Sequence, residues 1–147
     1  MPNLQENDDA MREVLTHAKV IAVVGHSDKR DRTSYQIAQF LRQVGYTVYP
    51  VNPTVREIDG KPCYPSLQAV PEPIDIVNVF RRSEHLPAIV EEAISKATAT
   101  LNASHAKTIW TQLGVTDDTA AQTALNAGLN IVMNACIKIE YLRLGIR

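Results

Sequence analysis

The chain has 147 residues, of which 45% are hydrophobic, 21% charged and 5% aromatic, so we expect one globular domain with an aliphatic core rather than a disordered chain. Its 15 Lys and Arg residues nearly balance 16 Asp and Glu residues, and a formal net charge of −1 provides no overall field to attract nucleic acid or an anionic membrane. The apolar runs are too short to span a bilayer and the first residues are polar, so we expect a cytoplasmic protein.

The N-terminal elements are expected to be a helix and then a buried strand. Residues 1–9 are typical of a flexible lead, and apolar residues at helical spacing predict a helix from about Asp9 to His17. The run Val20–Val24 is continuously apolar and mostly β-branched, which is typical of a strand buried on both faces. We therefore expect this strand to be the central one.

A charged loop separates this strand from a second helix. Apolar residues from Ile37 to Val44 trace one helical face, and Gly45 suits the left-handed position that follows a helix. Tyr46–Val51 then predicts a second strand.

The rest of the chain repeats this alternation after a long connection. Residues 54–73 are rich in Pro and Gly, so we expect irregular structure with one short helical turn at Ser66–Val70. The elements expected after it are a strand at Ile74–Phe80, a helix capped by Ser83, a polar insert at Thr98–His105, a strand at about Lys107–Gln112, a helix capped by Thr116 that ends at Gly128, a strand at Asn130–Met133 and a helix from Cys136.

Strands that alternate with helices and are joined by short turns predict an α/β fold. We expect a single Rossmann-like domain over residues 1–147, with about five parallel strands and helices on both faces. Ligands of such sheets bind at the carboxyl ends of the strands, where the strand order reverses. The loops that follow the strands are therefore the candidate site.

The loop after the first strand carries features of a phosphate site. Gly25 would let the backbone approach a ligand, and the hydroxyl groups and helix start that follow supply donors for phosphate oxygens. Lys29, Arg30 and Arg32 add positive charge. The alternative is a solvated loop whose cations are balanced by nearby aspartates, and the loop alone does not decide between the two.

A nicotinamide dinucleotide fits this loop poorly. The Gly-x-Gly-x-x-Gly pattern is missing beyond Gly25, and the second strand ends at Asn52-Pro53 without the carboxylate that would bind ribose hydroxyls. A ligand with an additional phosphate, such as coenzyme A, suits the three cations better.

Two later strands end in residues that could contact such a ligand. Arg81 follows Phe80 and could bind a phosphate with both guanidinium prongs, while Phe80 and Trp110 could cover a base or the pantetheine arm. The alternative is that both aromatic residues belong to the core and that Arg81 is a surface charge.

Five short motifs in series resemble one known family. They are Val24-Gly25-x-Ser27, Gly45-Tyr46-x-Val48-x-Pro50-Val51-Asn52-Pro53, Asp75-Ile76-Val77-x-Val79-Phe80-Arg81, Trp110-x-Gln112-x-Gly114 and Val132-Met133-x-x-Cys136. In this order they resemble the small stand-alone CoA-binding proteins, which are similar to the CoA-binding domain of the succinyl-CoA synthetase α subunit.

The resemblance implies that coenzyme A, or an acyl-CoA, lies across the carboxyl ends of the strands. The residues that it implies as ligands are Gly25, Ser27, Lys29, Arg30, Ser34, Asn52, Pro53, Phe80 and Arg81. The chain departs from the family pattern at Asn134-Ala135, where relatives usually have Asp-Arg, and in a longer polar insert. The resemblance implies neither an acyl group nor a protein partner.

Candidate catalytic residues are few. His26 could donate to an anion or be a surface histidine, and the Cys136 thiol could meet CoA or pack in the core. Cys63 and Cys136 lack metal-ligand spacing, so we expect no structural zinc. We therefore favour a non-catalytic CoA-binding module, and the alternative is a small enzyme that acts on a CoA thioester or another nucleotide-linked substrate.

Overall fold

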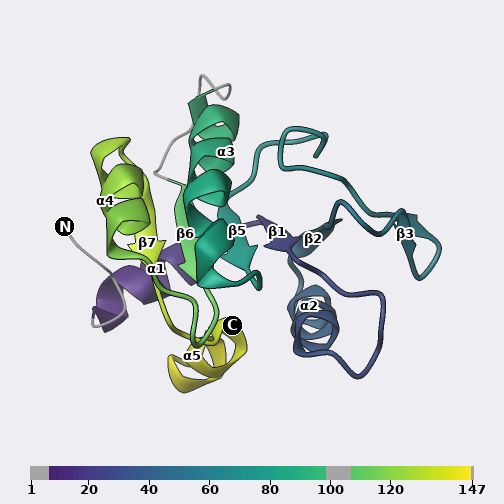
Figure 1. Ribbon diagram of the computed structural model, residues 1–147. Coiled ribbons are helices and arrows are strands. Elements are labelled where there is room, and N and C mark those ends of the chain that lie inside the picture. The colour runs from purple at the N-terminus through teal and green to yellow at the C-terminus, as the bar shows by residue number, and fades with distance from the viewer. Residues whose placement is uncertain (1–6, 99–106, 147) are drawn as a thin grey trace.

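A five-stranded parallel sheet forms the centre of the computed structural model, which describes residues 7–98 and 107–146 (Figure 1). The strand order is β2–β1–β5–β6–β7 and every neighbouring pair is parallel, so the predicted Rossmann-like α/β class is confirmed. The strands are β1 (Val20–Val24), β2 (Thr47–Val51), β5 (Ile76–Val79), β6 (Thr108–Thr111) and β7 (Asn130–Val132).

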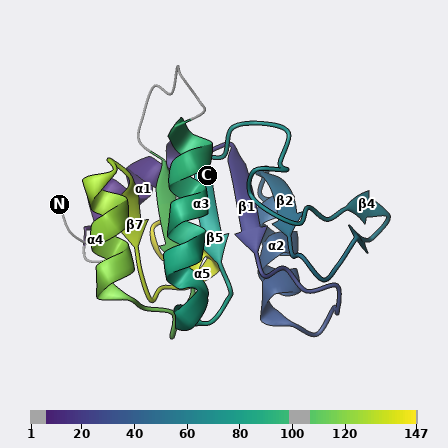
Figure 2. The same cartoon turned by 45° about the horizontal axis from the view of Figure 1, so that its top comes forward.

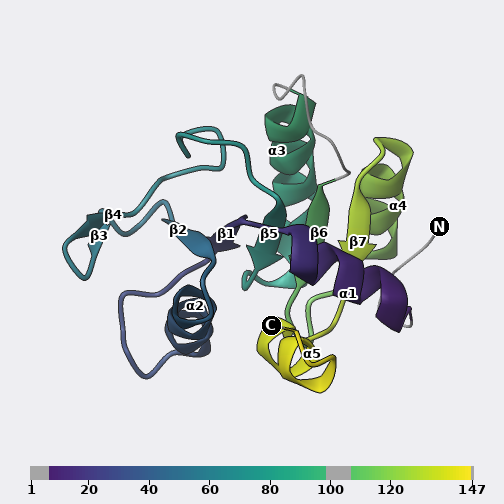
Figure 3. The same ribbon diagram turned by 180° about the vertical axis from the view of Figure 1, so that it is seen from behind.

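Helices cover both faces of this sheet (Figures 1 and 3). One face carries α1 (Asp8–His17), α2 (Thr33–Gln43) and α5 (Ile137–Arg143), and the other carries α3 (Leu86–Thr98) and α4 (Asp118–Asn126). Among the described residues, no helix has the length and apolar character needed to cross a membrane.

Strand β1 shows why its sequence is apolar throughout. Ile21 and Val23 pack with α1, α2 and α5, whereas Ala22 and Val24 pack with the helices on the opposite face. All five residues of the strand are buried, as a strand between two helical layers requires. It is an interior strand but not the central one, because β5 occupies the middle of the sheet.

Asp75 aligns the starting ends of three strands. Its Oδ2 accepts hydrogen bonds from the backbone N–H groups of Lys19 and Val20, at 2.9 and 3.0 Å. Its Oδ1 accepts from the Lys107 ammonium at 3.0 Å. These contacts hold the amino-terminal ends of β1, β5 and β6 together, at the end of the sheet opposite the candidate site.

The long connection contains a hairpin that the sequence pattern did not predict. Strands β3 (Glu57–Ile58) and β4 (Lys61–Pro62) pair antiparallel through a turn at Asp59 and Gly60, whose φ angles are 53° and 80° (Figure 2). Strands of two residues are too short to show alternation. At the predicted helical turn, Ser66–Val70, the structure has two consecutive backbone hydrogen bonds, from the Ala69 N–H to the Ser66 carbonyl at 3.3 Å and from the Val70 N–H to the Leu67 carbonyl at 3.2 Å, which form a turn and not a regular helix.

Two predicted helix caps are also corrected. The side chain of Asp117, not Thr116, caps α4 by accepting from the Ala120 N–H at 2.9 Å. Ser83 begins a short 3₁₀ turn, η2 (Ser83–His85), and its hydroxyl oxygen accepts from the Thr116 N–H at 2.9 Å. Ser83 therefore ties the loop after β6 to the loop after β5 instead of capping α3.

The predicted N-terminal lead and the predicted polar insert are described only in part. Residues 1–6 of the predicted lead and 99–105 of the predicted polar insert lie outside the described residues. The end of the lead is helical, because the Asn7 side chain accepts from the Ala10 N–H at 3.0 Å and α1 starts at Asp8. Thr98 is the last residue of α3.

Candidate functional site

The strand order reverses between β1 and β5. From β1 the chain crosses to β2 on one side, and from β5 it crosses to β6 on the other, so the two connections diverge at the carboxyl ends of β1 and β5 (Figure 2). A crevice at this point is the usual ligand site of an open α/β sheet. Gly25 and Phe80 are the first residues after these two strands.

Gly25 permits a close approach of the two loops. Its φ angle is 89°, and a Cβ atom there would lie 3.2 Å from Cγ of Arg81 and 3.4 Å from the carbonyl carbon of Phe80. Any larger residue would therefore be strained by its backbone and would press on the neighbouring loop. Gly25 therefore allows the loops after β1 and β5 to lie against each other at this point.

Two pockets of about 410 and 440 Å³ share Gly25 and Phe80, and together they form what we call the carboxyl-end cleft. The arginine pocket is otherwise lined by Asn52, Pro53, Thr54, Arg81, Arg82 and His85. The helix-start pocket is otherwise lined by Ser27, Lys29, Arg32, Thr33 and Ser34.

The helix-start pocket presents donors from the first turn of α2. No side chain caps this helix at Arg32, so the N–H groups of its first turn have no capping partner there. The loop before the helix is held by two hydrogen bonds, from the Ser27 N–H to Ser34 Oγ at 2.9 Å and from the Lys29 N–H to Ser27 Oγ at 3.0 Å. Free N–H groups and two nearby cations make this pocket suitable for a phosphate group.

The arginine pocket is shaped by Asn52. Its side-chain N–H donates to the His26 carbonyl at 3.1 Å, and its Oδ1 accepts from both the N–H and the hydroxyl of Thr54, at 3.0 and 2.8 Å. Across the pocket, Nη2 of Arg81 lies 3.4 Å from Nε2 of His85. The pocket thus combines a fixed loop with guanidinium groups that could bind an anion.

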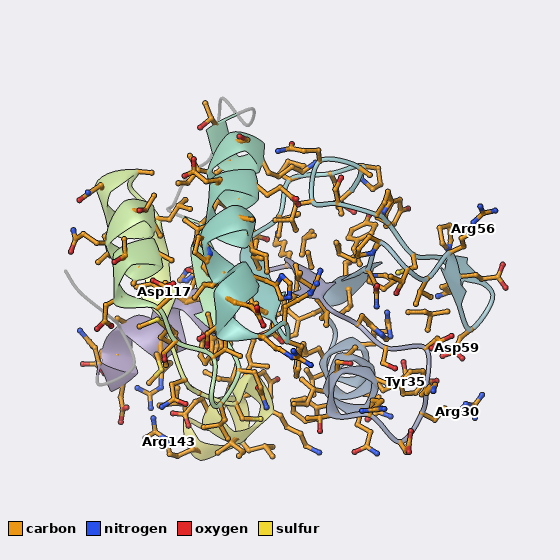
Figure 4. All side chains as sticks on the ribbon, in the orientation of Figure 1. Arg30, Tyr35, Arg56, Asp59, Asp117 and Arg143 are labelled. Carbon is orange, nitrogen blue, oxygen red and sulfur yellow. The ribbon has the colours of Figure 1, made fainter. Side chains whose placement is uncertain are left out.

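The structure brings together eight of the nine predicted site residues. Arg30 is the exception, because its side chain is 83% exposed and lies 3.9 Å from Asp59 of the hairpin (Figure 4). The pockets add lining residues outside that prediction, namely Arg32, Thr33, Thr54, Arg82 and His85. Their sequence signal is adjacency, since each follows a predicted site residue closely or precedes one directly.

His26 is neither a surface residue nor part of the cleft wall. It is fully buried, and its Nδ1 lies 2.7 Å from the Ser27 carbonyl oxygen. Its ring meets the Tyr35 ring edge-on with the centroids 5.8 Å apart. Burial lowers the pKa of His26, and this outweighs the opposite effect of the Ser27 carbonyl.

Trp110 and Cys136 lie in the core. Trp110 is fully buried and donates its indole N–H to the Ala135 carbonyl at 3.0 Å. Cys136 is 7% exposed and packs with the cluster around α1, α2 and α5. Within residues 7–98 and 107–146, no cluster of three or more potential metal ligands occurs.

Comparison with known proteins shows the family of the chain. A family model described as a CoA binding domain matches residues 19–142. The chain belongs to this CoA-binding family. The uncharacterized protein YneT of Bacillus subtilis, with 40% identity over 131 residues, covers 89% of this chain and 91% of its own length.

Two solved structures and one enzyme extend this family comparison. A hypothetical protein of Pyrococcus horikoshii OT3 has a TM-score of 0.85 and 38% identity, covering 94% of this chain and 92% of its own. A Thermus thermophilus protein has a TM-score of 0.84 and 30% identity, covering 94% of this chain and 98% of its own. An ADP-forming acetate–CoA ligase of Archaeoglobus fulgidus is 41% identical over 80 residues, which are 54% of this chain but 12% of the ligase.

Proposed function

We propose that this protein binds coenzyme A, or an acyl-CoA, in the carboxyl-end cleft and serves as a non-catalytic carrier, sensor or binding module. The observation that carries the proposal is the pairing of two cationic pockets at Gly25 and Phe80. Coenzyme A has two separate anionic groups, the pyrophosphate and the ribose 3′-phosphate. A cleft with an uncapped helix start on one side and two arginines on the other matches that distribution of charge.

The lining residues favour binding over hydrolysis. Among the described residues that line the cleft, the ionisable side chains are Lys29, three arginines and His85, and none is a carboxylate or a thiol. His85 is the one candidate general base among these side chains, and its side-chain contact is with Nη2 of Arg81 at 3.4 Å instead of with a hydroxyl nucleophile. The family comparison supports a CoA ligand and does not extend to the chemistry of the ligase.

Thermal unfolding with added ligand tests the proposal. We expect CoA to raise the melting temperature and NAD at equal concentration to raise it much less, because only a ligand that binds the folded state stabilises it. Equal stabilisation by NAD would contradict the proposal. Native followed by denaturing mass spectrometry of the purified protein would show whether CoA copurifies and whether it is covalently bound.

A parallel incubation separates a carrier from an enzyme. The protein is mixed with acetyl-CoA or succinyl-CoA, and the release of free thiol is followed. We expect no release above that of a protein-free control. Catalytic turnover of either thioester would replace the carrier proposal with the small-enzyme alternative.

A further inference from the structure

His26 is a buried polar group inside the loop that forms the cleft. Its chain neighbours Gly25 and Ser27 both line the cleft, while the His26 ring is fully buried behind them. Its backbone carbonyl accepts from the side chain of Asn52 at 3.1 Å. His26 therefore links the loop after β1, which lines the helix-start pocket, to the loop after β2, which lines the arginine pocket.

The hydrogen bonds assign the proton on the His26 ring. A carbonyl oxygen can only accept, so the 2.7 Å contact with Ser27 requires that Nδ1 carries the hydrogen. In the neutral ring Nε2 is then an acceptor, and it has no hydrogen-bond partner among the described residues. Protonation of Nε2 would create a buried N–H group, with a positive charge, that has no acceptor there.

The groups around the His26 ring give no net stabilisation of that positive charge. Arg42 of α2 opposes a positive charge, and the Tyr35 ring of the same helix lies at 86° to the His26 ring. Asp59 of the hairpin would favour it, but this carboxylate already accepts from the Tyr35 hydroxyl and lies 3.9 Å from Arg30. The net effect of burial and charge is to lower the pKa of His26.

We propose that His26 is a positioning residue for the CoA phosphates, which acts as a neutral ring by holding the Ser27 carbonyl away from the cleft. A carbonyl oxygen turned toward a phosphate would repel it, whereas the opposite orientation leaves the Ser27 hydroxyl and the start of α2 facing the anion. A charged ring would have to leave its buried site, which would open the loop. The inference rests on the proposed function, because it assumes that the ligand is CoA.

Two substitutions separate the effect of the hydrogen bond to the Ser27 carbonyl from the effect of protonating the His26 ring. Asparagine in H26N can donate to the Ser27 carbonyl but cannot become charged, and phenylalanine in H26F keeps the ring contact with Tyr35 but cannot donate. We expect H26N to bind CoA within about threefold of the parent at neutral pH, and H26F to bind at least about tenfold more weakly. H17N, on exposed His17 of α1, is the matched control for histidine replacement.

The dependence of CoA affinity on pH distinguishes the proposed role of His26 from a purely structural one, because a structural role would not change with the charge of the ring. CoA dissociation constants are measured by calorimetry between about pH 7.5 and about pH 4.5, a range that extends well below the ordinary histidine pKa because burial lowers that of His26. The ratio of the parent constant to the H26N constant cancels the titration of the ligand and of every group that the two proteins share. We expect this ratio to rise at least about threefold toward acid, since uptake of one proton allows up to tenfold per pH unit. The ratio of the parent constant to the H17N constant should stay flat.

The outcomes distinguish a failure of the proposed function from a failure of the proposed role of His26. No binding of CoA by the parent would overturn the proposed function, whereas parent binding with a flat or inverted H26N ratio would overturn the role of His26 alone. Tight binding by folded H26F would also overturn it. If H26F does not fold by circular dichroism, the H26N profile still decides the question.

Discussion

Arg81 is held in the cleft at both ends of its side chain. Its backbone and Cγ lie against Gly25, so the glycine leaves room for the arginine stem. Its guanidinium reaches toward His85, which lies four residues later at the end of the 3₁₀ turn. A side chain placed in this way can contact a ligand phosphate with little loss of conformational freedom.

We predict that Arg81→Ala weakens CoA binding at least tenfold, because one charge-assisted contact contributes about 1.5–3 kcal/mol. The free energy of unfolding should change by less than about 1 kcal/mol, since the residue is outside the core. Arg81→Lys should recover part of the affinity, because an ammonium lacks the two-pronged contact. Calorimetry and urea denaturation measure the two effects.

Arg56→Ala is the matched control, since Arg56 is an exposed arginine of the connection before β3 and lines neither pocket (Figure 4). Its CoA affinity should equal that of the parent. If folded Arg81→Ala binds as tightly as the parent, Arg81 is an ordinary surface residue and Arg82 becomes the next candidate.

The position of a single site residue can be predicted from the sequence where the residue directly follows a strand. Gly25, Phe80 and Arg81 directly follow apolar runs, and the end of such a run locates the cleft. Arg30 and His26 show the limit, because a charged loop has no periodicity to indicate which side chain turns outward and which is buried. Those directions depend on tertiary contacts with Tyr35 and Asp59.

At the scale of elements, α4 begins one residue later than the sequence predicts, because its cap is Asp117 and not Thr116. Thr116 and Asp117 can both cap a helix, and the sequence does not rank them. In the fold, the Thr116 N–H donates to the Ser83 hydroxyl oxygen, which places Thr116 in the loop and leaves Asp117 at the cap. A contact over 33 residues decided the boundary, so local pattern could not.

We predict that Asp117→Ala lowers the free energy of unfolding by about 1 kcal/mol, the usual contribution of a helix cap. Thr116→Ala should change it by less than about 0.5 kcal/mol, because its backbone N–H and not its side chain makes the recorded contact. Urea denaturation compares the two variants. Equal losses would show that Asp117 does not act as the cap.

The Asp75 contacts predict a dependence of stability on acid. Partial burial alone would raise the pKa of this carboxyl, but hydrogen bonds from the Lys19 and Val20 N–H groups and from Lys107 outweigh it, so the pKa is lowered. A lowered pKa in the folded state means that the stabilisation is present above the ordinary carboxyl pKa. It is lost as the pH falls through the folded value.

We predict that Asp75→Asn lowers the free energy of unfolding by about 1.5–3 kcal/mol at neutral pH, because three charge-assisted hydrogen bonds are weakened. The difference from the parent should shrink below about pH 4, where the carboxyl becomes protonated in the unfolded chain and then in the folded one. Urea denaturation across this range measures it. A difference that does not change with pH would rule out the charged Asp75 as its cause.

For the whole molecule, the alternation of strands and helices was enough to predict the sheet class and both helical layers. It did not predict the position of each strand, because β1 and β5 are both buried along their whole length and only the directions of the crossovers place β5 in the middle. The β3–β4 hairpin was missed because its pairing depends on a turn at Asp59 and Gly60 instead of on hydrophobic pattern.

Charge distribution at this scale also explains how a nearly neutral protein could hold a polyanion. The formal net charge is −1, yet Lys29, Arg32, Arg81 and Arg82 all line the carboxyl-end cleft. The attraction is therefore local and depends on the number of phosphates that the ligand brings to it. These cations exceed what a pyrophosphate at a helix start would require.

We therefore predict that the protein binds CoA more tightly than dephospho-CoA, by about ten- to a hundredfold at low salt, since one charge-assisted contact to the 3′-phosphate contributes about 1.5–3 kcal/mol. The preference should shrink as salt is added, because Lys29, Arg32 and Arg82 are exposed and a Debye length of about 10 Å at 0.1 M screens them. Calorimetry with both ligands at low and high salt measures the preference and its screening. Equal dissociation constants at low salt would mean that no cation of the cleft contacts the 3′-phosphate, and that the pyrophosphate alone accounts for the electrostatic part of binding.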